Sequence, residues 1–183
     1  MSKCVLLIGP VCAGKTKLAE TLIEKGFLKN KSNFYGIEQS RKLISDGTMA
    51  GELDAWAAFL RQIQSPASND NAIYEFSGTG RHVYSVCWAM EYSVKENSKN
   101  EWLVVYCLAP DNVIEARFPN KVYDAPFPFN MGSPLNSVTT TKKELKELYE
   151  KPNSWNRSPS LAFNTDVENY NKIADDIIAF FNK

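Results

Sequence analysis

The sequence lacks any long apolar run, and this limits where the protein can reside. Its first apolar stretch, Cys4–Ile8, has five residues, and no other stretch approaches the roughly 20 that a membrane-spanning helix needs. Cys4–Ile8 is also too short for the apolar core of a secretory signal peptide. We therefore expect a soluble, cytoplasmic protein with no membrane partner.

Net charge is absent as well, because 21 Lys and Arg residues balance 21 Asp and Glu residues. A protein that coats duplex DNA without sequence preference is normally basic, since its affinity comes from neutralising phosphates. The charge balance therefore argues against a non-specific DNA coat, but it leaves room for a local basic cleft.

Closely spaced cysteine pairs are also missing. The four cysteines, Cys4, Cys12, Cys87 and Cys107, show no spacing of the kind that zinc knuckles or redox dithiols require. This pattern is typical of a reducing cytosol. At 183 residues, the chain can bury a core as one domain without disulfides or metals.

Apolar strand-like runs and helical patterns alternate along the chain. The expected strands are Cys4–Ile8, Asn33–Ile37, Ala72–Phe76, Trp102–Leu108 and Leu161–Phe163. The expected helices are Thr16–Lys25, Gln39–Ser45, Glu52–Ile63, Val83–Val94, Asp111–Arg117, Thr141–Tyr149 and Val167–Phe181. This order predicts an α/β fold, in which about five mostly parallel strands carry helices on both faces. We expect residues 1–183 to form a single domain.

The segment Gly9-Pro10-Val11-Cys12-Ala13-Gly14-Lys15-Thr16 matches the phosphate-binding P-loop pattern, also called Walker A. It follows a predicted buried strand and opens a predicted helix, so its main-chain N–H groups can bind phosphate. We expect the loop to bind ATP together with Mg²⁺. Lys15 is the expected catalytic contact to the β- and γ-phosphates, and the Thr16 hydroxyl is the expected Mg²⁺ ligand. The predicted nucleotide-binding residues in this loop are Gly9, Val11, Cys12, Ala13, Gly14, Lys15 and Thr16.

Glu75 ends the predicted strand Ala72–Phe76 with a carboxylate. Together with the P-loop, it resembles the nucleoside and nucleotide kinase branch of P-loop proteins, in which the first strand lies beside the strand carrying an acidic Mg²⁺ residue. The resemblance implies a three-layer α/β/α P-loop kinase fold with a lid. It also implies that Glu75 holds hydrated Mg²⁺ through water, although this family usually has Asp there.

The region from about 117 to 137 corresponds to the lid of that family. Lid arginines in the kinase branch neutralise charge on the transferred phosphoryl group. Arg117 is the only arginine here, with Lys121 four residues later, and it is the expected catalytic cation. The aromatic and proline-rich remainder, Tyr123–Phe129, favours an active-site flap.

Near the C-terminus, Ala162–Thr165 resembles the strand-to-loop segment that borders the adenine in this superfamily. The resemblance implies that Asn164 and Thr165 are neighbours of the base.

Glu38 and Arg41 follow the predicted second strand, within expected acceptor-binding helices at about 38–65. Polynucleotide 5′-hydroxyl kinases and several small-molecule hydroxyl kinases place a general base here, with an arginine soon after it. That resemblance implies that Glu38 accepts the proton of an attacking hydroxyl and that Arg41 binds the acceptor. The same region also resembles the acceptor helices of adenylate-kinase-like enzymes, where Arg41 would hold the α-phosphate of the acceptor.

The segment Glu75–Arg81 and the aromatic flap resemble phage kinases that phosphorylate 5-hydroxymethyluridine within DNA. This resemblance makes Glu75 and Arg81 expected substrate-binding residues beside Arg41, with Arg81 contacting the backbone. The flap aromatics would be available to stack on an exposed base. The protein would then lie in the host cytoplasm.

Three hypotheses remain open. The first is a kinase acting on a hydroxyl of a nucleotide or nucleic acid, with hydroxymethyluridine in DNA as the best single acceptor. The second is a nucleoside-monophosphate kinase, and the third is a slow NTPase switch. A dedicated GTP-binding protein should carry an Asn-Lys-x-Asp segment, which this sequence lacks. The preferred nucleoside triphosphate and the oligomeric state do not follow from the sequence.

Overall fold

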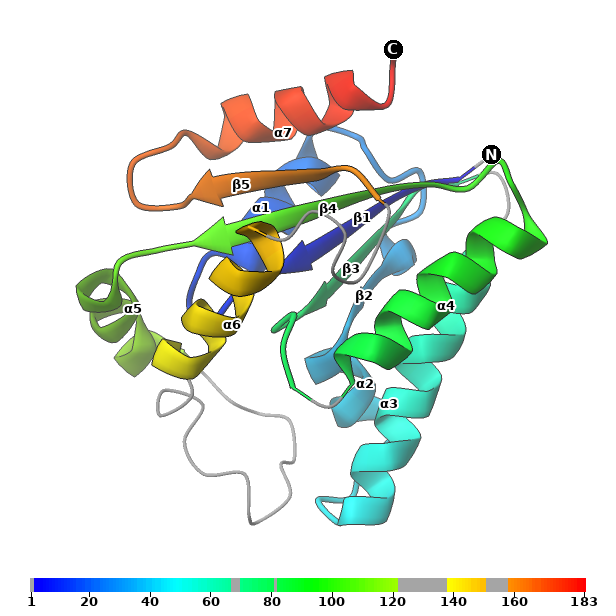
Figure 1. Ribbon diagram of the computed structural model, residues 1–183, viewed down its shortest axis with the longest axis horizontal. Helices are drawn as coiled ribbons and strands as arrows, with labels where there is room; N and C mark the ends of the chain where they lie inside the picture. Colours follow the sequence, from blue (N-terminus) through cyan, green and yellow to red (C-terminus); the bar gives the residue numbers. More distant parts are fainter. Residues whose placement is uncertain (1, 67–69, 81, 122–137, 151–157) are drawn as a thin grey trace.

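The structure, a computed structural model, describes residues 2–66, 70–80, 82–121, 138–150 and 158–183, without the side chains of 148–150. The described strands form one five-stranded sheet in the order β2-β3-β1-β4-β5 (Figure 1). They are β1 (Lys3–Ile8), β2 (Phe34–Gly36), β3 (Ala72–Phe76), β4 (Glu101–Leu108) and β5 (Ser160–Asn164). Every neighbouring pair is parallel, which confirms the predicted sheet.

Helices follow the strands in the order that the sequence predicts. They are α1 (Lys15–Glu24), α2 (Ile37–Ile44), α3 (Met49–Gln64), α4 (Val83–Glu96), α5 (Asp111–Arg117), α6 (Val138–Glu150) and α7 (Tyr170–Phe180), with short 3-10 helices η1 (Lys31–Asn33) and η2 (Phe118–Asn120). Among the described helices, none is long and apolar enough to cross a membrane.

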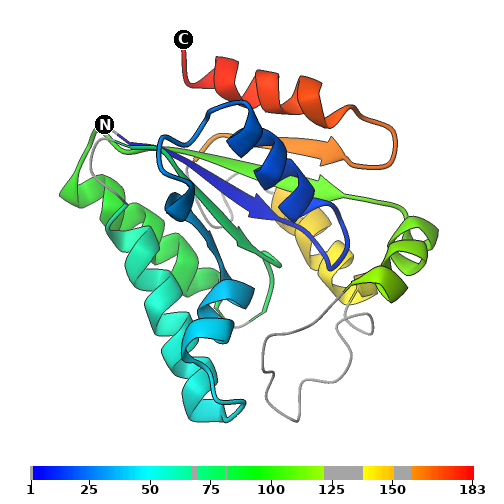
Figure 2. The same cartoon turned by 180° about the vertical axis from the view of Figure 1, so that it is seen from behind.

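Two hydrophobic cores lie on opposite faces of the sheet. Alternate residues of β1 point to opposite faces, so Leu6 packs in the core with α3 and α4, while Leu7 packs with α1 and α7. Figures 1 and 2 show these helix pairs on the two sides of the sheet. Burial on both faces explains why β1 is an unbroken apolar run, and it confirms the three-layer α/β/α architecture.

The sheet geometry also positions the candidate site. Because all five strands are parallel, their carboxyl ends meet at one edge, toward which the arrowheads point in Figure 1. On β3, Glu75 lies in register with Leu7 on one side and with Gly36 on the other. The loops after β1, β2 and β3 therefore emerge side by side.

Candidate functional site at the carboxyl edge of the sheet

The loop after β1 has the local geometry of a phosphate-binding turn. The Gly9 N–H donates to the Ser77 carbonyl at 3.1 Å, which ties this loop to the end of β3. Gly14 precedes α1 in the left-handed conformation, with φ of 84°. A Cβ added at Gly14 would lie 2.2 Å from the Tyr170 hydroxyl oxygen and 3.0 Å from the Thr165 methyl carbon, so a larger residue would displace these side chains as well as strain the backbone.

Lys15 begins α1, but its side chain turns back over the loop. Its ammonium donates to the carbonyls of Gly9 at 3.0 Å and Pro10 at 2.8 Å. The residue is only 9% exposed. Its charge is therefore held inside the loop, where bound phosphate oxygens could replace the carbonyls as acceptors.

Thr16 and Glu75 meet across the ends of α1 and β3. The Thr16 hydroxyl donates to the two carboxylate oxygens of Glu75 at 3.0 and 3.1 Å. Burial raises the pKa of the Glu75 carboxyl, and the charge of Lys15 and the Thr16 hydrogen bond only partly oppose this. These two predicted metal-site residues are thus in direct contact.

A hydroxyl beside a carboxylate is an oxygen donor set that suits Mg²⁺, which usually keeps several water ligands. Within the described part of the chain, no group of three or more His, Cys, Asp or Glu residues could hold a metal ion. The residues present therefore fit an ion bound through the Thr16 hydroxyl, water and phosphate, with Glu75 acting through water.

Glu38 lies in the first turn of α2, directly after β2. One of its carboxylate oxygens lies 3.1 Å from the ammonium of Lys121, which follows η2. The two side chains are 39% and 27% exposed, respectively. Glu38 and Lys121 both influence the pKa of Glu75, in opposite directions, so all three charges belong to one cluster.

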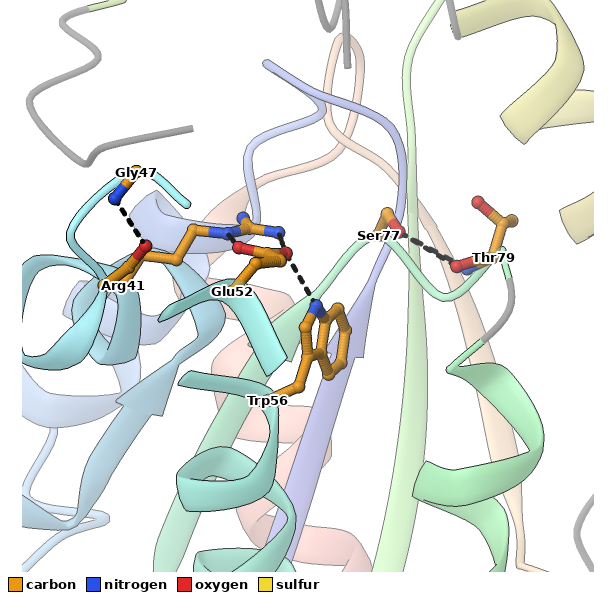
Figure 3. A network of polar contacts seen from close by, with 7 residues as sticks. Arg41, Gly47, Glu52, Trp56, Ser77 and Thr79 are labelled. Atoms are coloured by element: carbon orange, nitrogen blue, oxygen red, sulfur yellow. Dashed lines mark hydrogen bonds and ion pairs between the residues drawn. The ribbon is translucent and has the colours of Figure 1, made fainter. Parts of the chain in front are cut away.

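Arg41 and Glu52 form a separate, buried ion pair between α2 and α3 (Figure 3). The Arg41 Nε and one terminal nitrogen donate to the two Glu52 oxygens at 2.7 and 2.6 Å. The Trp56 indole N–H also donates to Glu52, at 2.8 Å, and the Trp56 ring stacks on His82 with centroids 4.2 Å apart. Acceptor binding by Arg41 stays a prediction, and it must operate with Glu52 beside the guanidinium.

Arg117, at the end of α5, contacts two loops at once. It donates to the Cys12 carbonyl at 3.3 Å, and to the hydroxyl and carbonyl of Thr165 at 3.0 and 3.1 Å. It thereby connects the loop after β1 to Thr165, which directly follows β5; Thr165 and Asn164, the last residue of β5, are the expected adenine neighbours. Its role on the transferred phosphoryl group stays a prediction.

The structure therefore gathers Lys15, Thr16, Glu38 and Glu75 at one edge, as their strand-end positions predict. Arg81 and residues 122–137 of the expected lid lie outside the described residues. Sequence reasoning assigned no role to Lys121 or Glu52. Their contacts join residues 83 and 11 positions apart, respectively, and the only available signal was a charged residue near each expected site residue.

Comparison with known proteins identifies the class of fold. No protein-family model matches this sequence, and no curated protein does. Solved structures with a similar fold include several kinases, and they confirm the predicted three-layer α/β fold.

Three of these structures can be named. A sugar kinase from Janibacter sp. HTCC2649 shares 14% identity with a TM-score of 0.60, covering 100% of this chain and 95% of that one. Deoxyadenosine kinase from M. mycoides, with products dCMP and dCDP, shares 11% identity with a TM-score of 0.58, covering 98% of both chains. Mycobacterium tuberculosis APS kinase, in complex with AMPPNP and APS, shares 14% identity with a TM-score of 0.56, covering 100% of this chain and 98% of that one. At these identities the similarity establishes the fold alone.

Proposed function

We propose that this protein is an ATP-dependent kinase that transfers the γ-phosphate to a hydroxyl of a nucleotide or nucleic-acid acceptor. The observation that carries this proposal is the position of Glu38. Its carboxylate shares one charge cluster with Glu75, which itself contacts Thr16 of the phosphate loop. A hydroxyl acceptor needs a base at such a point, whereas an acceptor that is already an anionic phosphate does not.

In the proposed reaction, the acceptor oxygen attacks the γ-phosphorus while its proton passes to the Glu38 carboxylate. The bond from the γ-phosphorus to the bridging oxygen breaks, and its electron pair leaves with ADP. Lys15 and the N–H groups at the start of α1 bind the phosphates. Mg²⁺, when bound, neutralises charge on the β- and γ-phosphates. Thr16 and Glu75 would hold that ion.

For the acceptor, our specific proposal is the 5-hydroxymethyl group of hydroxymethyluridine in DNA. It is supported by the likeness of Glu75–Arg81 to phage kinases with that substrate, and by a carboxylate suited to a primary hydroxyl. A nucleoside or nucleoside monophosphate is the second candidate, since one structure of similar fold is named a deoxyadenosine kinase. In a slow NTPase switch, water would replace the acceptor hydroxyl and the product would be inorganic phosphate.

A transfer screen with ATP labelled on its γ-phosphate tests this proposal. Its acceptors are nucleosides, monophosphates, 5′-hydroxyl oligonucleotides and hydroxymethylated DNA. We expect the hydroxymethylated DNA to be labelled, Lys15→Ala to abolish transfer, and Glu38→Gln to slow the chemical step by roughly 10²–10⁴. The control Glu24→Gln changes an exposed carboxylate at the end of α1 and should have no effect.

Each of the other results selects another hypothesis. Labelled monophosphates together with a less than fivefold effect of Glu38→Gln would identify a monophosphate kinase. Release of inorganic phosphate without any labelled acceptor would identify a slow NTPase.

A further inference from the structure

We infer that Lys121 is the cation that contacts the γ-phosphate of the donor, and that it leaves Glu38 to do so. This inference rests on the proposed kinase function. It assigns to Lys121 the phosphate-neutralising role that the sequence pattern placed on Arg117. It also implies that Glu38 becomes available as a base when the donor nucleotide is bound.

Arg117 is held by other groups. Its guanidinium donates three hydrogen bonds, one to the Cys12 carbonyl and two to Thr165. These acceptors lie in the backbone and side chains of two loops, so Arg117 holds the loop after β1 against the loop after β5. A move to the phosphate would break that connection.

Lys121 lies instead among the groups that would surround the reaction. The turn of η2 is closed by the Lys121 N–H, which donates to the Phe118 carbonyl at 2.9 Å. Beyond this turn, the Lys121 ammonium lies 3.1 Å from the Glu38 carboxylate. Two nearby groups also respond to its charge. Burial raises the pKa of both Cys12 and Glu75. The charge of Lys121 opposes this rise more than Lys15 or Arg117 does at Cys12, and less than Lys15 does at Glu75.

These positions imply that the Glu38 carboxylate and the γ-phosphate compete for the Lys121 ammonium. The terminal phosphate of ATP carries more negative charge than a carboxylate, so it attracts the ammonium more strongly at the same distance. While the Lys121 ammonium stays in place, one Glu38 carboxylate oxygen already accepts a hydrogen bond from it. Moving Lys121 to the phosphate would therefore both neutralise the transferred group and free Glu38 to accept the proton.

Nucleotide affinity tests this without a turnover assay. Isothermal titration calorimetry would measure Kd for AMP-PNP and for ADP, each with Mg²⁺, on the full-length chain. Lys121→Met should raise the Kd for AMP-PNP by roughly tenfold or more, which is the effect of losing a charge-assisted hydrogen bond. It should leave the Kd for ADP within about twofold of the wild-type value. Lys121→Arg should keep most of the affinity for AMP-PNP.

Lys25→Met is the matched control, because Lys25 forms an exposed ion pair with Asp175 at 2.8 Å beyond the end of α1. It should change neither affinity. Glu38→Gln removes a negative charge that competes for the ammonium, so it should tighten AMP-PNP binding a few-fold and leave ADP binding unchanged. This gain should disappear in the double variant with Lys121→Met.

The outcomes separate the two proposals. If wild-type protein binds AMP-PNP and ADP, but Lys121→Met weakens both equally or neither, the inference about Lys121 is wrong and the kinase proposal stands. The same holds if Glu38→Gln fails to tighten AMP-PNP, which provides an answer even if Lys121→Met does not fold. If wild-type protein binds neither nucleotide, the proposed function fails, and the inference fails with it.

Discussion

Arg41 and Glu52 show how buried charge is compensated between α3 and α2, the helix that carries Glu38. The Arg41 and Glu52 side chains are only 7% and 2% exposed, and each satisfies the other through two hydrogen bonds. Such a pair adds little compared with apolar residues of equal volume, because both charges have lost water. Removing one partner is costly, however, because the other charge remains buried and uncompensated.

We therefore predict that Glu52→Gln lowers the free energy of unfolding by about 3–5 kcal/mol. Urea denaturation of the wild type and the variant would measure the loss. The double variant Arg41→Met with Glu52→Met should be considerably more stable than Glu52→Gln, because it removes both buried charges. Glu20→Gln, which breaks an exposed pair with Lys17 at 4.0 Å, should change stability by less than about 1 kcal/mol.

The pH dependence of this loss has a definite sign. Burial would raise the pKa of Glu52, but the hydrogen bonds and charge of Arg41 and the Trp56 N–H hold it below its ordinary value of 4.5. The folded state therefore binds this proton more weakly than the unfolded chain. The stabilisation is complete above about pH 4.5 and is lost as the pH falls through the folded pKa. The difference in stability between wild type and Glu52→Gln should shrink over that acidic range, and a constant difference would contradict the assignment.

At the level of elements, the loop from β3 to α4 packs against two other elements at Gly78. Both Gly78 and Gly80 have positive φ, at 82° and 85°. An added Cβ at Gly78 would lie 2.7 Å from the Ile8 Cβ and 3.0 Å from a Leu145 methyl carbon, whereas at Gly80 nothing lies within 4 Å. An alanine would meet the same backbone strain at both positions, so the two positions differ in packing.

We predict that Gly78→Ala destabilises the protein by roughly 1–3 kcal/mol more than Gly80→Ala, because only Gly78 adds overpacking to the strain. Urea denaturation of both variants isolates the packing contribution, since each loses the same conformational freedom. Gly78 lies three residues after Glu75, so its variant should also weaken Mg²⁺-dependent ATP binding. Equal losses of stability would show that the contact with Ile8 and Leu145 is absent in solution.

Most elements could be predicted from the sequence, because apolar runs and apolar periodicity are local signals. Ala72–Phe76 and Asp111–Arg117 were predicted with their observed bounds. The predicted start of α3 was three residues too late, because Thr48 caps the helix by accepting the Gly51 N–H at 3.1 Å. The predicted start of α7 was three residues too early, because Asn169 caps that helix at Tyr170.

The site could be predicted only where strand ends define it. Lys15, Thr16, Glu38 and Glu75 each follow or end a strand, so a parallel sheet brings them to one edge. The pairing of Arg41 with Glu52 and of Glu38 with Lys121 depends on how helices and loops pack. No periodicity in the sequence encodes which charge meets which.

At the scale of the whole molecule, the candidate site lies at the centre of the sheet edge, since β1 is the middle strand. The neutral net charge limits how a polynucleotide could bind there. Described cations near the site include Lys15, the proposed contact to the donor phosphates, and Lys121 and Arg117, which pair with protein groups. Judged from the described residues alone, a DNA acceptor would therefore be held by few phosphate contacts, and by recognition of the exposed base.

We predict a shallow salt dependence for a hydroxymethylated DNA acceptor. With about two or three phosphate contacts, kcat/KM for the DNA should fall roughly 10- to 40-fold between 50 and 200 mM salt, measured at saturating ATP. A protein with six to ten contacts would lose about 10³–10⁵ over the same range. The free hydroxymethylated nucleoside is the matched control, because it has no backbone phosphates and should show almost no salt dependence. A steep loss with DNA would mean that a basic surface not formed by these residues binds the strand, and equal dependence for both acceptors would mean that the enzyme recognises the nucleoside alone.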